Sequence, residues 1–192
     1  QSINIMGVKH AVVTSVDRDD LEDGGSEHWA NTVESIRKFN PTTTLETLIP
    51  DFQGNTKQLD RVINVHPEVV SHNIETVERL SKQVRVQAKY DRSLFVLKYL
   101  TDRGMKTKSG IMCGMGETKE EIFQTLRDLR TSGVSIVTLG QYMQPTPRHL
   151  AVSEYIHPDT FLEYKNFGLE IGFTYVESGP LVRSSYHAER HL

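Results

Sequence analysis

The sequence predicts an α/β fold built on a sheet of parallel strands. Short runs rich in apolar and β-branched residues alternate with longer runs whose apolar residues recur at helical spacing. Strict alternation with short links requires parallel strands joined by right-handed crossovers. About six strand–helix units follow one another. An incomplete TIM-type (β/α)6 barrel and a doubly wound sheet both fit, although the Gly-x-Gly-x-x-Gly fingerprint of a dinucleotide-binding sheet is absent.

Strands are expected where short apolar runs are bounded by proline, glycine or polar residues. The run at 10–15 is apolar and β-branched, as in a buried parallel strand. Pro50 ends the next run. In order, the predicted strands are 10–15, 44–49, 69–73, 107–112, 136–139 and 173–177.

Helices are expected where the apolar residues form one stripe. Residues 1–6 look like the end of a helix, and Ser26 is the expected N-cap of the first long one. Thr118 and Glu121 form a capping box before the clearest helix, which Gly133 ends. The further predicted helices are 26–39, 56–65, 76–80, 93–103, 118–131 and 158–172.

Composition indicates a soluble globular chain with one sizeable core. It has 192 residues, 37% hydrophobic and 24% charged. A net charge of -3 argues against electrostatic nucleic-acid binding, and no run is apolar enough for a membrane span or a signal peptide. The first residue is not Met, so we expect a piece whose N-terminal part is missing. The single cysteine, Cys113, excludes an all-cysteine metal site and is expected to be buried and inert rather than reactive.

Polar residues gather directly after the predicted strands. In a barrel, functional side chains lie on the face where the strands end. Polar clusters fall there at 14–20, 50–54, 71–76, 113–117 and 140–146. The first cluster continues into an acidic loop, which could hold a divalent cation. Its spacing lacks the glutamate that an EF-hand needs, and a solvated loop is the reading that residue types favour.

Several residues in these clusters could bind an organic ligand. Asn73 and Glu75 could hold a ribose diol, because a carboxylate accepts two hydroxyl hydrogen bonds; Asn73 could equally cap a helix. Arg85 could clamp a carboxylate or be a surface arginine. The glycines in 110–117 let backbone approach a flat ligand, or form a plain strand–turn–helix. The eight histidines show no metal-binding spacing.

Residues 179–192 form a tail denser in polar side chains than chain ends usually are. A Gly-Pro turn and an apolar pair precede a polar run, which suggests that the tail docks; the alternative is the solvated end of a strand. We therefore divide the chain into 1–178 and this tail. Because adjacent residues of an extended segment point to opposite sides, only one of Ser184 and Ser185 is expected to face a ligand.

Six ordered blocks of the chain resemble lipoyl synthases of the radical S-adenosylmethionine (SAM) superfamily. The family's closing Arg-Ser-Ser-Tyr run ligates an iron–sulfur cluster through its second serine, which corresponds to Ser185 here. The family also carries two cysteine triplets upstream, and this chain has neither. The resemblance implies an incomplete TIM-type (β/α)6 radical SAM barrel, truncated at its N-terminus, with a cluster-capping tail. The blocks are TSVDRDDL at 14–21, ETLIPDFQG at 46–54, SHNIETV at 71–77, KSGIM with GMGET at 108–118, GQYMQPT at 140–146 and ESGPLVRSSY at 177–186.

The resemblance also implies a reaction, cofactors and partners. Two sulfur atoms enter at C6 and C8 of an octanoyl chain carried on a lysine. The cofactors are SAM and two 4Fe-4S clusters, most of whose ligands lie outside this chain. The partners are octanoylated carrier domains (2-oxoacid dehydrogenase E2 subunits and the glycine cleavage H protein) and a reductant such as ferredoxin or flavodoxin. Neither nucleic acid nor membrane is involved, and the location is cytoplasmic, or mitochondrial or plastid in a eukaryote.

Individual roles follow from the same resemblance. The cofactor-binding residues are Thr14, Ser15 and Asp17 at the methionyl end of SAM, Asn73 and Glu75 at the ribose, Arg85 at the carboxylate, and Gly114, Gln141 and Met143 around the adenine. Ser185 is the iron ligand and, with Arg183, the catalytic pair. Arg183 anchors the tail through charge-assisted hydrogen bonds.

Two other readings stay open. The chain could be a non-catalytic barrel remnant that binds a partner or SAM without iron. Another TIM-type enzyme is disfavoured, because no histidine or carboxylate pair has catalytic spacing. The 192 residues alone are expected to be inactive, because a cubane cluster needs about three or four thiolates.

Overall fold

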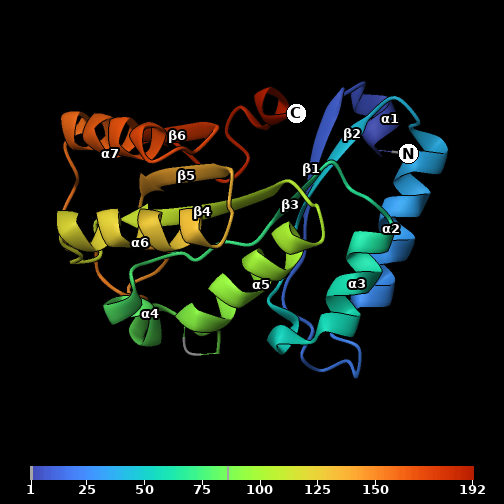
Figure 1. The fold of residues 1–192 in the computed structure, drawn as a ribbon, viewed down its shortest axis with the longest axis horizontal. Coiled ribbons are helices and arrows are strands. Elements are labelled where there is room, and N and C mark those ends of the chain that lie inside the picture. The colour runs from blue at the N-terminus through green and yellow to red at the C-terminus, as the bar shows by residue number, and fades with distance from the viewer. Residues whose placement is uncertain (1, 86) are drawn as a thin grey trace.

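The computed structural model describes residues 2–85 and 87–192, and its centre is a six-stranded parallel sheet (Figure 1). The strands lie side by side in the order of the sequence. A doubly wound sheet reverses its order at a switch point, whereas a TIM-type barrel does not, so the barrel alternative is confirmed. No pairing joins the first strand to the last among the described residues, so the barrel is open. The strands are β1 (His10–Thr14), β2 (Thr44–Leu48), β3 (Val69–Ser71), β4 (Thr107–Cys113), β5 (Ile136–Gln141) and β6 (Tyr175–Gly179).

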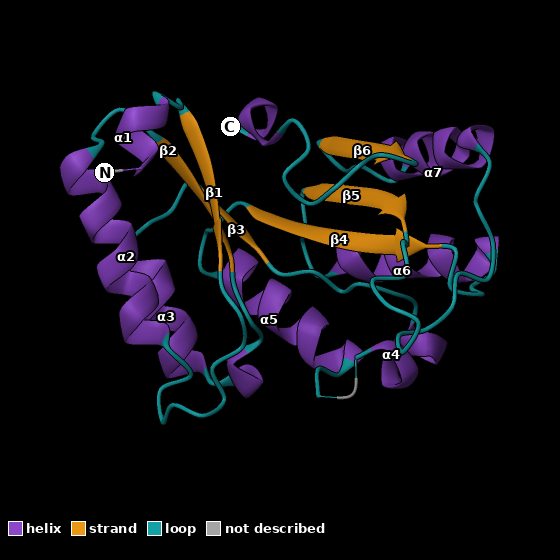
Figure 2. Cartoon of the chain, turned by 180° about the vertical axis from the view of Figure 1, so that it is seen from behind, coloured by secondary structure: helices purple, strands orange, loops and turns teal. Residues whose placement is uncertain are grey.

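Helices cover the outer face of this sheet (Figures 1 and 2). Every predicted helix and strand is present, with ends shifted by a few residues. The largest shifts are at α4 and α5, both of which lie in one stretch between β3 and β4. Gln1, which begins the first expected helix, lies outside the described residues. The helices are α1 (Ser2–Met6), α2 (Ser26–Phe39), α3 (Thr56–Asn64), α4 (Glu78–Val84), α5 (Tyr90–Asp102), α6 (Lys119–Thr131) and α7 (Pro158–Glu170), with 3-10 turns η1 (Phe52–Gly54) and η2 (Ala188–His191).

Side chains alternate between the two faces of each strand. In β5, Val137 and Leu139 are fully buried in the apolar core under the helices. Thr138 and Gly140 point the other way, to the inner, concave face of the sheet, where they line a cavity. The outer face therefore supplies the hydrophobic stability, and the inner face carries the polar residues that concern function.

The N-terminal end of the inner face is closed by a buried ion pair and by the C-terminal segment. Lys108 Nζ lies 3.0 Å from the carboxylate of Glu46, which also accepts a hydrogen bond from Ser71 at 2.6 Å. Lys106 donates to the backbone carbonyl of His191 at 3.1 Å, and the His191 ring is fully buried. Both ribbon views show this segment ending between β1 and β6.

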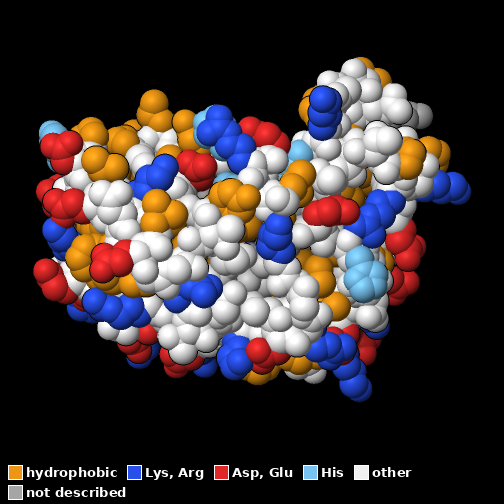
Figure 3. Space-filling model, turned by 45° about the horizontal axis from the view of Figure 1, so that its top comes forward, with side chains coloured by type: hydrophobic (Ala, Val, Ile, Leu, Met, Phe, Trp, Pro, Cys, Tyr) orange, Lys and Arg blue, Asp and Glu red, His pale blue; other side chains and the backbone are white. Residues whose placement is uncertain are grey.

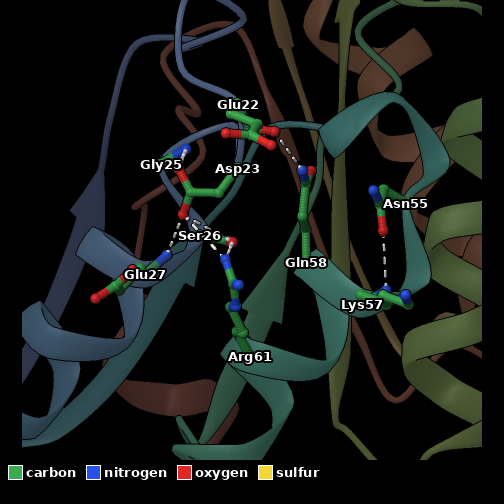
Figure 4. Close-up of polar contacts among 9 residues, drawn as sticks. All are labelled: Glu22, Asp23, Gly25, Ser26, Glu27, Asn55, Lys57, Gln58 and Arg61. Atoms are coloured by element: carbon green, nitrogen blue, oxygen red, sulfur yellow. Dashed lines mark hydrogen bonds and ion pairs between the residues drawn. The ribbon is translucent and has the colours of Figure 1, made fainter.

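The acidic loop before α2 is bonded to the first turn of that helix, whose N-cap is Gly25. The Asp23 carboxylate accepts hydrogen bonds from the backbone N–H groups of Gly25 at 3.0 Å and Glu27 at 2.8 Å, and it pairs with Arg61 of α3 at 3.1 Å (Figure 4). Ser26 is already the first helical residue, so its expected role as the N-cap is wrong. A second contact also joins this loop to α3, because the Gln58 side chain donates a hydrogen bond to the Glu22 carbonyl. The loop thus fixes the end of β1 against α3.

Two further expectations can be compared with the structure. The capping box of Thr118 and Glu121 is present and confirms that prediction. Within residues 2–85 and 87–192, no cluster of three or more His, Cys, Asp or Glu side chains could hold a metal ion, so the cation-site hypothesis for the acidic loop gains no support. Among the described helices, none has both the length and the apolar character needed to cross a bilayer.

Candidate functional site

Two adjacent hollows open where the strands end. The first, which we call the β4–β5 hollow, has a volume of about 220 Å³ and lies over the ends of these two strands and the tail. The second, the β1–β3 hollow, has about 270 Å³ and lies over the ends of the first three strands. Asn73 and Glu75 line both, so the two hollows meet at these side chains. Together they form an elongated site at the C-terminal edge of the barrel, as the fold predicts.

The Asn73–Glu75 pair sits on a strained loop that is tied to β4. Glu75 has a φ of 66°, which only few non-glycine residues adopt. Its N–H donates to the Gly110 carbonyl at 2.9 Å, and its carbonyl accepts from Met112 at 2.8 Å. Asn73 Nδ2 donates to Glu75 Oε1 at 3.1 Å. The expected alternative, Asn73 as a helix cap, is wrong, because the N-cap of α4 is Val77.

Burial raises the pKa of Glu75, while the Asn73 hydrogen bond and nearby Arg85 oppose that rise. Gly110 makes room for this pair, since a Cβ there would lie 2.8 Å from Asn73 Oδ1. A polar donor and a carboxylate thus stand side by side at the junction of the hollows. This arrangement suits a ligand with two neighbouring hydroxyl groups.

The β1–β3 hollow has groups of both charges on its walls. Thr14, Ser15 and Asp17 line it from the end of β1, and Arg85 lines it from the end of α4. Desolvation, followed by the charges of Asp19 and Asp51, raises the pKa of Asp17. Arg85 is half-buried, so it is not the plain surface arginine of the alternative reading. A zwitterionic ligand end would find a partner for each charge here.

The end of β5 and the residues that follow it form one wall of the β4–β5 hollow. Gln141 and Met143 line it, and Gln141 is held by the loop that follows, donating to the Glu154 carbonyl at 3.0 Å and accepting from the Ile156 N–H at 2.9 Å. Gly114 lines neither hollow. A Cβ at Gly114 would lie 2.3 Å from Gln141 Nε2, so this glycine supports the wall from behind.

The tail docks on the end of β5, as expected for a docking segment. Val182 is buried, and its carbonyl lies 2.2 Å from the position that a Cβ of Gly140 would take. Arg183 Nη1 donates to the carbonyls of Val182 at 2.8 Å and Gln141 at 3.4 Å. These bonds agree with the anchoring role predicted for Arg183.

The two serines of the tail differ in position. Ser184 lines the β4–β5 hollow, and Ser185 is exposed outside it. The tail turns here, with the Tyr186 N–H donating to the Arg183 carbonyl at 2.9 Å, so the expected extended conformation is wrong. The serines still face different surroundings, but a turn separates them rather than strand alternation.

Cys113 closes β4 on its outer face and is fully buried. Its burial confirms the expected position and raises the pKa of the thiol, and that the side chain is inert stays a prediction. With one cysteine in the sequence, these residues cannot supply the thiolates of a 4Fe-4S cluster.

Figure 3 shows acidic and basic side chains interspersed on the face of the molecule that it draws.

Sequence reasoning missed the floor of the β4–β5 hollow. Met112 and Thr138 line it, and Gly140 leaves space for the tail. The sequence of β5 carries a sign of this floor, because a threonine and a glycine interrupt its apolar run at alternate positions, which share one face of the strand. Without knowing which face was concave, that alternation could not be assigned.

Comparisons with known proteins agree with this geometry. The family model described as the radical SAM superfamily matches residues 1–129. The chain is 62% identical over 193 residues to the lipoyl synthase of Flavobacterium johnsoniae and 64% to that of Christiangramia forsetii. It is also 64% identical to the mitochondrial lipoyl synthase of Nematostella vectensis. These alignments cover all of this chain and 67%, 66% and 66% of the relatives, so the chain spans about two thirds of their length.

Solved structures share the fold at low sequence identity. Methylornithine synthase is 14% identical, with a TM-score of 0.58 over 93% of this chain and 60% of that one. Coproporphyrinogen III oxidase from Escherichia coli, described as a radical SAM enzyme, is 13% identical, with a TM-score of 0.58 over 85% of this chain and 38% of that one. At this identity the likeness concerns the fold alone.

Proposed function

Because the chain belongs to the lipoyl synthase family of the radical SAM superfamily, we propose that it is the part of a lipoyl synthase that binds SAM and carries the cluster-capping tail. The observation that supports the proposal best is the elongated site at the ends of the strands. Two hollows meet there at Asn73 and Glu75, with charged groups in one and a docked tail in the other. The reaction is insertion of two sulfur atoms, at C6 and C8 of a protein-bound octanoyl group.

SAM fits the chemistry of this site along its length. Asn73 and Glu75 at the junction would hold the ribose hydroxyls. In the β1–β3 hollow, Arg85 would bind the carboxylate and Asp17 the ammonium group, with Thr14 and Ser15 beside them. In the other hollow, the wall of Gln141 and Met143, supported by Gly114, would enclose the adenine. The glycine at 110 keeps the space that the ribose contacts need.

Two 4Fe-4S clusters belong to the proposal, with their thiolate ligands outside these 192 residues. When bound, SAM and the clusters supply the radical that removes hydrogen from C–H bonds, and the sulfur that replaces it. This chain contributes Ser185, whose exposed hydroxyl is accessible to a cluster held by another region. Arg183 holds the tail in place, and the barrel keeps water away from the reacting carbon.

The partners follow from the reaction. The substrates are octanoylated carrier domains of 2-oxoacid dehydrogenase E2 subunits and of the glycine cleavage H protein, and ferredoxin or flavodoxin is the reductant. A bacterial chain of this kind would act in the cytoplasm and a eukaryotic one in the mitochondrion or plastid. Residues 1–178 form the catalytic barrel part and 179–192 the capping tail.

The test compares the two tail serines in a protein that carries the chain together with the upstream cysteine triplets. Ser185→Ala should abolish lipoyl product while 5′-deoxyadenosine is still made, because SAM cleavage and sulfur donation use separate clusters. Ser184→Ala is the matched control and should be much milder. Normal lipoyl product from Ser185→Ala would contradict the ligand role. No product from the unsubstituted protein would favour the non-catalytic module instead.

A further inference from the structure

A buried chain of hydrogen bonds lies directly behind the β1–β3 hollow. His72 Nδ1 lies 3.0 Å from the Ile49 carbonyl oxygen, and its Nε2 lies 2.9 Å from Ser93 Oγ. Arg85 Nη1 lies 3.0 Å from the same Ser93 oxygen. His72 is 2% exposed and Ser93 is 0% exposed, so water does not compete for these contacts. The chain thus joins the end of β2, through α5, to an arginine on the wall of the hollow.

The direction of every bond in this chain follows from its two ends. A carbonyl oxygen can only accept, so His72 carries a proton on Nδ1. Burial and the nearby charge of Arg85 lower the pKa of His72 to about 4, so at neutral pH its Nε2 has no proton and must accept. Ser93 therefore donates its hydroxyl proton to His72. The lone pairs of the Ser93 oxygen are then turned toward Arg85, which donates.

The same contacts fix how Arg85 is presented to the hollow. Its Nη1 also donates to the Asn73 carbonyl at 2.9 Å and lies 3.5 Å from the Ile74 carbonyl, so the hydrogens of this nitrogen are taken up by Ser93 and by the backbone at Asn73 and Ile74. Among residues 2–85 and 87–192, Nε and Nη2 have no hydrogen-bond partner, and no ion pair joins Arg85 to Asp17. The guanidinium is therefore held by one edge, and its other edge remains for a bidentate contact.

We propose that His72 and Ser93 are positioning residues that aim Arg85 at the carboxylate of an α-amino-acid ligand end in the β1–β3 hollow. The proposal rests on the proposed function, since SAM is the ligand whose amino-acid end would lie there. Without the Ser93 hydroxyl, Arg85 would keep its bond to the Asn73 carbonyl but lose the second contact that fixes this edge, so the ligand itself would have to order the guanidinium. Affinity for the carboxylate would fall, whereas contacts to the rest of the ligand would not change.

The test measures binding of SAM and of decarboxylated SAM, by equilibrium dialysis, to a protein that carries this chain together with the upstream cysteine triplets. The two ligands share the sulfonium, the amine and the nucleoside, and differ in the carboxylate alone. Ser93→Ala should weaken SAM binding about tenfold and leave decarboxylated SAM binding within about twofold. Ser178→Ala is the matched control, because it removes the hydrogen bond that a serine hydroxyl of β6 donates to the Phe161 carbonyl of α7, away from both hollows. It should change neither affinity.

The outcomes separate the two proposals. If the unsubstituted protein binds neither ligand, the SAM site and this inference are both contradicted. If Ser93→Ala weakens both ligands equally, the positioning role is overturned and the SAM site stands. A second readout does not depend on a variant that folds: ¹⁵N NMR of the unsubstituted protein at neutral pH should show the His72 proton on Nδ1. A proton on Nε2 would reverse the chain of bonds and overturn the inference.

Discussion

The two ends of the inner face of the sheet are built in opposite ways. At the N-terminal end, Glu46, Lys108 and Ser71 satisfy one another at 1% exposure or less, and Lys106 of the same end holds the buried His191 of the C-terminal segment. At the C-terminal end, polar groups such as Glu75 face hollows. The same face therefore has a filled end and an open end, both lined by polar side chains. Polarity on an inner strand face is thus no sign of a binding site until the space beside it is known.

A single strand shows how the difference arises. Lys108, Gly110 and Met112 follow one another on the inner face of β4. The long lysine side chain reaches Glu46 and fills the space near the start of the strand. Two residues later, glycine contributes no side chain, and the β4–β5 hollow begins. We therefore expect substitutions at the filled end to change stability, and those at the open end to change ligand binding.

The largest effect is expected from breaking the buried ion pair. Lys108→Met leaves the Glu46 carboxylate without its counter-charge, which should lower the free energy of unfolding by about 3–5 kcal/mol. The matched control is the double variant Glu46→Leu with Lys108→Met, which removes both charges and should recover most of that loss. Urea unfolding followed by circular dichroism measures both. A Lys108→Met protein as stable as the unsubstituted chain would contradict the assignment of this end as the structural one.

A smaller effect is expected where the tail meets β5. Gly140→Ala places a methyl group against the Val182 carbonyl and should cost about 1–3 kcal/mol by displacing the tail. Gly179→Ala is its control, since the nearest atom, on Val182, is 3.6 Å from that Cβ. Hydrogen exchange should show faster exchange of the Tyr186 amide in the first variant alone. Equal exchange in both variants would mean that the tail does not depend on the contact with Gly140.

The last of the stability effects is one that vanishes at neutral pH and grows as the pH falls. Burial lowers the pKa of both His72 and His191 to about 4, whereas an unfolded histidine titrates near 6.5. The unfolded chain then binds more protons between these values, so stability is full above about pH 6.5 and falls as pH drops toward 4.

The variant His191→Phe separates the contributions of the two ends. The ring nitrogens of His191 have no hydrogen-bond partner among the described residues, so phenylalanine should flatten the pH dependence without losing a bond. The exposed His28→Gln serves as control and should leave the slope unchanged. Urea midpoints measured between pH 4 and 7 give the result. An identical slope in the His191→Phe protein would show that this end does not resist protonation.

The order of strands and the place of the site could be predicted from the sequence because both depend on local patterns. Short apolar runs, helix periodicity and the capping box at Thr118 are all visible within a few residues. The polar clusters after the strands then meet at one edge as a geometric consequence of parallel pairing. Asn73 and Glu75 can be found in this way without knowing the hollows that they line.

What the sequence could not predict depends on contacts between distant residues. Lys108 looks like an exposed strand residue until Glu46, 62 positions away, is placed beside it. The N-cap of α2 is Gly25 rather than Ser26, and the Asp23 carboxylate that bonds the first turn is also paired with the distant Arg61 of α3. The turn at Ser184 and Ser185 comes directly after Val182, whose carbonyl lies against Gly140 of β5. None of these pairs has the short separation at which a helix or a strand brings two residues together, so no local pattern predicts the contact.

Binding of SAM to the 192-residue chain and to Glu75→Gln, with unfolding measured on the same samples, tests the division of the inner face most directly. We expect Glu75→Gln to weaken SAM binding at least about tenfold, because it removes a charge-assisted contact to the ribose, without lowering the urea midpoint. Glu177→Gln, near His191 at the filled end, should leave SAM binding unchanged. Unchanged SAM affinity in Glu75→Gln, or equal losses in both variants, would contradict the separation of an open, ligand-binding end from a filled, structural one.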